Sequence, residues 1–203
     1  MMWKRCQRGG LLGRVVRDKY AGHRRFIEEL IGSQNARREQ LPVTEILAIA
    51  SIPDGRGLTR VEMLVRFEED CRELAEVLAD RGIDGRTRGE ILRNTGEVLR
   101  RFHGCGFLHG DLNLKNILLR LTPDSCYQVL LTDLDPGGLP PRASSQQNLL
   151  RLVRSYRKLT REGLPAVSSV EAFRFLHAYF GCDRVRLREM WDRSIALLVR
   201  RAR

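Results

Sequence analysis

The chain has 203 residues and a formal net charge of +11, because 36 Lys and Arg outnumber 25 Asp and Glu. Its 42% hydrophobic and 30% charged residues are typical of a globular protein. We expect no membrane span and no signal peptide, and five scattered cysteines without a CxxC pair argue against a disulfide framework and a zinc site. A reducing cytoplasm fits this composition. The basic excess predicts an anionic partner, which could be nucleic acid, a membrane surface or a phosphorylated substrate.

The first third of the chain is predicted to be partly β. A short strand should precede Gly9-Gly10, and charged and apolar residues alternate at helical spacing from Asp18 to Arg38. Two apolar segments, Ile46 to Ile52 and Val61 to Phe67, flank the turn sequence Pro53-Asp54-Gly55-Arg56-Gly57. This arrangement predicts an antiparallel hairpin.

The remainder is predicted to be mostly helical. Apolar residues recur at helical spacing between Leu74 and Phe102, and one more apolar strand is expected at Val129 to Leu134. Further helices are expected at Ser145 to Leu159, Val170 to Phe180 and Leu187 to Arg203, the first of them capped by Ser144 or Ser145. No internal repeat or low-complexity linker divides the chain.

The segment most informative about chemistry is His109-Gly110-Asp111-Leu112-Asn113-Leu114-Lys115-Asn116. It matches the kinase catalytic-loop pattern H-x-D-L-x-x-x-N. In that pattern Asp111 accepts the proton of the acceptor hydroxyl or orients it, and Asn116 offers an amide oxygen to a magnesium ion. His109 is expected to support the loop from behind through hydrogen bonds, and the next residues should form a strand that fixes its end.

A second carboxylate lies at the end of the next predicted strand. Asp133 follows the apolar run Leu130-Leu131 and occupies the position of the aspartate in the kinase D-F-G triplet, which here reads Asp133-Leu134-Asp135. The alternative interpretation is that Asp111 and Asn116 only cap turns, as such residues often do. That alternative leaves unexplained why two apolar strands begin or end at a carboxamide and a carboxylate.

At these residues the chain resembles the lipopolysaccharide kinase family, specifically the 3-deoxy-D-manno-octulosonic acid (Kdo) kinases and their lipopolysaccharide-core relatives, including heptose kinases. HGDLNLKNILL is similar to that family's catalytic loop, and LLTDLDPGG is similar to its metal loop. Two further segments are similar to the family. The first is Arg8-Gly9-Gly10-Leu11 with Arg17-Asp18-Lys19-Tyr20, which resembles its RGG…RDRY stretch, and the second is the stretch from Asn148 to Lys158, which resembles the helix after its metal loop. The resemblance extends from about Trp3 to about Lys158.

The resemblance implies an α+β, protein-kinase-like, two-lobed fold with a truncated small β lobe and a mostly helical large lobe. The expected parts of this single domain are residues 1–68, which lack a glycine-rich loop, and residues 69–203. Two more strands and that loop would precede Lys4 in such a kinase, so a misassigned start, a shortened chain or a degenerate protein is expected. Without a glycine-rich loop, the affinity for ATP is expected to be affected.

The resemblance also implies the roles of individual residues. Asp111 is the expected catalytic base, supported by His109, while Asn116 and Asp133 are the expected Mg²⁺ ligands. Lys4 is expected to hold the ATP phosphates, with Glu28 as its helix partner and Glu29 as the alternative. A frayed terminus for Lys4 and a solvated helix face for Glu28 are the competing interpretations.

Three features point to a small or lipid-linked acceptor. Few residues separate the metal loop from the next helix, which leaves no room for a peptide-docking platform. Position 113 is Asn, where many protein serine/threonine kinases have Lys. The predicted helix from Leu149 to Arg161 carries five basic residues and no acidic one, and such a face is either simply solvated or meets anionic head groups.

These observations together predict an ATP- and Mg²⁺-dependent transferase that phosphorylates a sugar hydroxyl of the lipopolysaccharide inner core, such as Kdo–lipid A. It should be cytoplasmic and peripheral on the inner membrane of a Gram-negative bacterium, with an anionic membrane surface as a partner. Nucleic acid is not expected as a partner, since no binding motif accompanies the charge. The alternatives are a catalytically impaired pseudokinase that serves as a binding module and a soluble small-molecule phosphotransferase.

Overall fold

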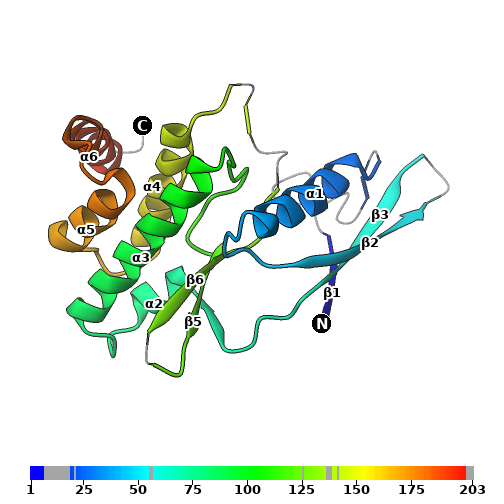
Figure 1. The fold of residues 1–203 in the computed structure, drawn as a ribbon, viewed down its shortest axis with the longest axis horizontal. Helices are drawn as coiled ribbons and strands as arrows, with labels where there is room; N and C mark the ends of the chain where they lie inside the picture. The colour runs from blue at the N-terminus through cyan, green and yellow to red at the C-terminus, as the bar shows by residue number, and fades with distance from the viewer. Residues whose placement is uncertain are drawn as a thin grey trace.

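The computed structural model describes residues 1–6, 19–20, 22–54, 57–124, 126–135, 139–140 and 142–199. The RGG part of the family resemblance and the first two residues of its RDRY part, Arg17 and Asp18, therefore lie outside the described residues. Figure 1 shows a small β-rich part with β1, β2, β3 and α1 at one end, and a helical part with α3 to α6 at the other. The predicted α+β class is confirmed.

The small part consists of a three-stranded antiparallel sheet with one helix against it. The strands β1 (Met2–Arg5), β2 (Ile46–Pro53) and β3 (Thr59–Val65) are ordered β1-β3-β2, and Lys4 pairs with Met63. The β2–β3 pair is the predicted hairpin. The helix α1 (Arg24–Arg38) packs against β2.

The predicted helix from Asp18 was wrong in its first turn. Tyr20 forms a β-bridge with Thr59 instead, and α1 begins only at Arg24. Gly22 explains the break, because its φ of 100° lies in the left-handed region that ends regular structure.

Within the described residues, the larger part combines a second sheet with five helices. Its strands β4 (Cys71–Glu73), β5 (Ile117–Leu121) and β6 (Tyr127–Leu131) form an antiparallel sheet in that order. The helices are α2 (Leu74–Ala79), α3 (Gly85–Gly104), α4 (Ser145–Arg161), α5 (Ser169–Phe180) and α6 (Arg184–Val199). Ser144 caps α4 by accepting the backbone N–H of Gln147. None of the described helices is long and apolar enough to cross a membrane.

Each part has its own apolar core. The small core gathers Cys6, Tyr20, Phe26, Ile46, Val61 and Met63. The large core lies among α2 to α6 and the second sheet, and it also includes Ala36 of α1 and Leu41 and Val43 of the segment that follows. The segment after α1 ties the two together, since the Leu131 N–H donates to the Pro42 carbonyl and the Thr44 N–H donates to the Leu131 carbonyl. This link fixes α1 and the end of β6 relative to one another.

Candidate active site

The predicted catalytic loop lies between α3 and β5, against the start of the metal loop. β5 and β6 pair so that Ile117 lies opposite Leu131, and the Thr132 N–H donates to the Asn116 carbonyl at 3.1 Å. The residues just before β5 and just after β6 therefore emerge at the same edge of the sheet. Asn116 and Asp133, remote in sequence, are brought to the same edge.

His109 is fully buried beneath the catalytic loop. Its Nε2 lies 2.9 Å from the Thr132 carbonyl, and its Nδ1 accepts the Asp111 backbone N–H at 3.1 Å. Burial lowers the pKa of His109, which favours the neutral ring that this pair of contacts requires, with a proton on Nε2 only. The imidazole thus links the catalytic loop to the metal loop, as its expected supporting role demands, although that role in catalysis stays a prediction.

A buried hydrogen-bond network of side chains from the helices holds His109 in place. The Asn148 side chain on α4 brackets the His109 peptide: its Oδ1 accepts the His109 N–H at 3.1 Å, and its Nδ2 donates to the His109 carbonyl at 2.6 Å. His103 on α3 lies 3.0 Å from the same Oδ1 and 2.6 Å from the Tyr179 hydroxyl on α5. Three helices therefore position one peptide of the catalytic loop.

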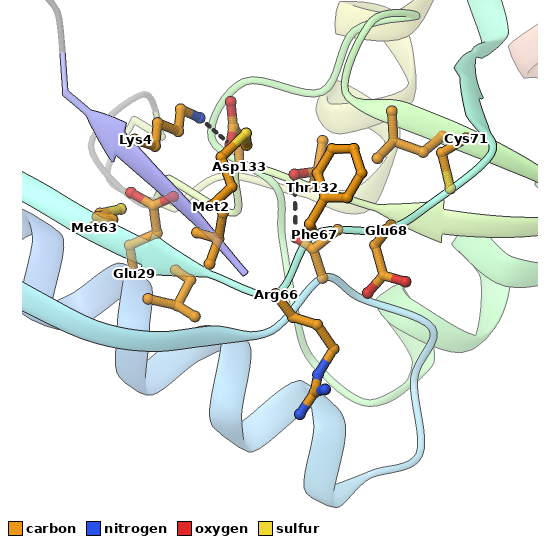
Figure 2. Close-up of a pocket in the computed structure, with 14 residues that line it drawn as sticks. Met2, Lys4, Glu29, Met63, Arg66, Phe67, Glu68, Cys71, Thr132 and Asp133 are labelled. Carbon is orange, nitrogen blue, oxygen red and sulfur yellow. Dashed lines mark hydrogen bonds and ion pairs between the residues drawn. The ribbon is translucent and has the colours of Figure 1, made fainter.

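The metal loop begins with a left-handed residue. Asp133 has a φ of 57°, a conformation that Asp tolerates better than most residues, and its carbonyl accepts the Asp135 N–H at 2.7 Å. The Asp133 carboxylate contacts Lys4 Nζ at 2.5 Å, as Figure 2 shows. The Asp135 carboxylate is held by the Arg25 guanidinium, whose Nε lies 2.8 Å from Oδ1 and whose Nη2 contacts Oδ2.

The structure does not bring Glu28 to Lys4. Glu28 pairs with Arg24 on the exposed face of α1, at 2.8 Å. Its neighbour Glu29, the alternative considered from the sequence, is only 7% exposed and lines the same cavity as Lys4 and Asp133 (Figure 2). Adjacent helix positions differ by about 100° around the axis, so only one of the two can face the site. Glu28 is therefore not the partner of Lys4 in this structure, where Lys4 pairs with Asp133, and a pairing of Lys4 with Glu29 stays a prediction.

The cavity between the two parts of the molecule has a volume of about 220 Å³. Lys4, Glu29, Thr132 and Asp133 form its polar end. Its other walls come from β1, β2 and β3, from the connecting segment Arg66 to Glu68 and from Leu118 on β5. No motif in the sequence marks this connecting segment as a wall of the cavity. An apolar slot that opens toward a Lys–Asp pair suits a flat ring joined to an anionic tail.

The family model that matches this sequence is the lipopolysaccharide kinase (Kdo/WaaP) family, over residues 1–179. That span includes both loops and the cavity. The chain belongs to the lipopolysaccharide kinase (Kdo/WaaP) family.

Curated relatives of this Kdo/WaaP chain carry the name 3-deoxy-D-manno-octulosonic acid kinase. The protein of Xanthomonas campestris pv. campestris (strain B100) is 35% identical over 162 residues, which are 77% of this chain and 61% of the relative. The protein of Stenotrophomonas maltophilia (strain R551-3) is 32% identical over 191 residues, 91% of this chain and 68% of the relative. The chain thus spans about three fifths of the Xanthomonas protein.

A solved structure described as WaaP in complex with acyl carrier protein resembles this Kdo/WaaP chain in its fold. The match has a TM-score of 0.63 at 15% identity, and it covers 89% of this chain and 78% of that one. At that identity the likeness concerns the fold alone. It confirms the kinase-like architecture expected from the catalytic-loop and metal-loop motifs.

Proposed function

We propose that this chain is an ATP-dependent kinase that phosphorylates a sugar hydroxyl of the lipopolysaccharide inner core, Kdo–lipid A or a similar glycolipid. The observation that carries the proposal is the gathering of Lys4, Asp133, Asn116 and Asp111 at the junction of the two parts, in a chain of the Kdo/WaaP family. The proposed parts are residues 1–68, which bear Lys4, and residues 69–203, which bear the two loops.

The cavity supports binding of the nucleotide. Its apolar walls would take the adenine ring beside the segment Arg66 to Glu68, and Lys4 at its polar end would bind phosphate oxygens. In the structure Lys4 pairs with Asp133, so phosphates would replace a carboxylate on an ammonium group that already lies in the site. Glu29 lies in the same cavity and would hold Lys4 when Asp133 is engaged elsewhere.

Asn116 and Asp133 would hold Mg²⁺. The fit rests on their chemistry and placement, since hard oxygen donors suit Mg²⁺ and both residues lie at one edge of the second sheet. The Asn116 Nδ2 donates to the Asp111 carbonyl at 2.9 Å, which leaves the amide oxygen for a cation. When bound, Mg²⁺ would supply charge neutralisation for the transferred phosphoryl group.

Asp111 would act as the catalytic base. It is exposed at the tip of its loop, where a bulky acceptor can reach it, and two side-chain amides donate toward its Oδ2. Its carboxylate would accept the proton of the acceptor hydroxyl as that oxygen attacks the γ-phosphate. His109 and Asn148 would maintain the loop geometry beneath it.

The glycolipid acceptor places the proposed enzyme at the cytoplasmic face of a bacterial inner membrane. Exposed Arg154 and Lys158 on α4 support attraction to an anionic membrane surface. The five basic residues predicted on this helix are not equally available, since Arg157 donates to the Leu197 carbonyl of α6 at 2.8 Å. The basic face of α4 that is available to a membrane is therefore narrower than the five basic residues in the sequence suggest.

The test is transfer of labelled phosphate from Mg·ATP to Kdo–lipid A by the purified protein. The variant D111A should lose about 100-fold or more of the rate, because a positioned base contributes about 10² to 10⁴. D192A, which removes an exposed carboxylate of α6, is the matched control and should keep the rate. Equal rates for D111A and the unchanged protein would refute the role of Asp111.

Nucleotide binding separates the proposal from a pseudokinase. Mg·ATP should raise the melting temperature of both the unchanged protein and D111A, since ligand binding stabilises the folded state by mass action. The absence of any shift at millimolar Mg·ATP would indicate a binding module that does not use ATP. A shift accompanied by transfer only to soluble sugars would indicate a small-molecule phosphotransferase.

A further inference from the structure

The side chain of Asn113 saturates its hydrogen-bonding capacity within the catalytic loop. Its Oδ1 accepts the backbone N–H groups of Lys115 at 2.8 Å and Asn116 at 3.1 Å. Its Nδ2 donates to the Asp111 carbonyl at 3.0 Å and to the Asp111 Oδ2 at 3.1 Å. A primary amide has two acceptor lone pairs and two donor hydrogens, so all four are used.

These four contacts fall into two groups with different consequences. The two accepted hydrogen bonds close the turn that leads from Asn113 to Asn116, which is local structure. The two donated hydrogen bonds reach back to Asp111 and fix both its backbone and its carboxylate. An aspartate at position 113 would preserve the first group and abolish the second.

Asn113 is the better placed of two amides that approach the Asp111 carboxylate. The Asn116 Nδ2 lies 3.5 Å from the same Oδ2, beyond the usual range for such a bond, while it donates well to the Asp111 carbonyl at 2.9 Å. Within the described residues no other side chain is recorded as donating to the Asp111 carboxylate.

We infer that Asn113 is a positioning residue for the base, which holds the Asp111 Oδ2 so that Oδ1 faces the acceptor hydroxyl. This inference rests on the proposed function. Asp111 is exposed, and without a fixed partner its carboxylate would rotate freely, whereas a base oxygen must lie within about 2.6–3.2 Å of the hydroxyl oxygen whose proton it accepts. Because its amide is fully engaged, Asn113 has no donor left for a nucleotide phosphate.

The deciding experiment compares N113D with the unchanged protein in the Kdo–lipid A assay. N113D keeps the acceptor of the turn and loses both donors to Asp111. We expect kcat to fall about 10- to 100-fold, as misplacement of a catalytic group does, with the KM values for ATP and acceptor within about twofold. N94D is the matched control, because Asn94 also donates its Nδ2 to a backbone carbonyl, that of Tyr127, away from the site.

Each kinetic outcome decides the inference. A fall in kcat at constant KM in N113D but not in N94D supports it. A kcat within twofold of the unchanged protein overturns it, and so does a loss confined to KM, which would make Asn113 a substrate-binding residue. A melting temperature lowered as far as in N113A would show that the turn, rather than the base, depends on the amide donors.

A second measurement separates this inference from the proposed function. The side-chain amide resonances of Asn113, identified by their disappearance in N113D, should shift in D111A because their acceptor is removed. That shift requires no phosphate transfer. If the unchanged protein fails to phosphorylate Kdo–lipid A and the shift is seen, the substrate is wrong and the contact stands. Unshifted resonances overturn the contact.

Discussion

Glu29 is 7% exposed, and it lines the same cavity as Asp133 and Lys4. Burial is the main reason that its pKa rises to about 7, and the nearby charges of Asp133 and Asp135 raise it further against the opposing effect of Lys4 and Arg25. A carboxyl with a raised pKa binds a proton more tightly in the folded protein than in the unfolded chain. Its ionisation therefore destabilises the fold as pH increases.

The variant E29Q tests this titration. Stability of the unchanged protein should fall as pH rises from the ordinary Glu value of 4.5 to about 7, and the neutral amide should not share that loss. E29Q should therefore be more stable than the unchanged protein at pH 8, by up to about 3 kcal/mol, and about equally stable at pH 4. Urea unfolding at the two pH values measures the difference.

The adjacent residue provides the control for this prediction. E28Q alters a side chain on the exposed face of α1, so its unfolding curves should follow those of the unchanged protein at both pH values. Parallel pH dependence in E29Q and the unchanged protein would contradict the buried titration. If Glu29 also holds Lys4 during catalysis, E29Q should bind Mg·ATP more weakly despite its higher stability.

Among the elements, α3 and α5 pack closely against one another, and this packing helps to position the site. Gly96 of α3 lies so close to α5 that a Cβ would meet the Phe175 carbonyl oxygen at 2.4 Å. The same two helices supply His103 and Tyr179 to the buried hydrogen-bond network that ends at the His109 peptide. A displacement of α5 would therefore reach the catalytic loop.

G96A should destabilise the protein by about 1–3 kcal/mol, because a methyl group forced against backbone costs more than the helix gains from alanine. The matched variant is G32A in α1, where a Cβ would meet nothing within 4 Å. G32A should raise the free energy of unfolding by up to about 1 kcal/mol, because alanine favours the helix more than glycine does. Urea unfolding measures both variants. A G96A protein as stable as G32A would disprove the close approach.

The elements that the sequence predicted well are those defined by local pattern. The hairpin of β2 and β3 follows from two apolar runs around a Pro-Asp-Gly turn, and the strand that begins at Ile117 follows from the motif before it. β4 was not predicted, because a strand of three residues has too little pattern of its own and depends on pairing with β5.

The parts of the site that the sequence missed depend on contacts between distant residues. Glu28 and Glu29 are identical side chains in adjacent positions, so only the packing of α1 decides which is buried. Asn148 lies 39 residues from the His109 peptide that it brackets, and its helix predicts only an apolar stripe. Local motif matching identifies the residues that we propose to react and overlooks Asn148, which holds the His109 peptide.

For the molecule as a whole, the net charge of +11 favours approach to any anionic surface, whereas the placement of the charge decides the orientation on arrival. Arg154 is exposed on α4, and exposed Lys158 lies 4.0 Å from Glu162. α4 also bears Asn148, which is tied to the catalytic loop. Docking through this helix would keep the active site at a constant distance from the membrane.

The double variant R154E/K158E tests the docking face by sedimentation with vesicles that contain anionic phospholipid. Each basic residue near such a surface contributes about 1 kcal/mol, so reversing two should weaken binding at least about tenfold, and added salt should weaken it in the unchanged protein. R86E/R93E on α3 makes the same change in net charge. If net charge alone governs binding, both double variants should lose vesicle affinity to the same extent, and that result would contradict a docking face on α4. A loss confined to R154E/K158E would locate it there, because the total charge of the two proteins is identical.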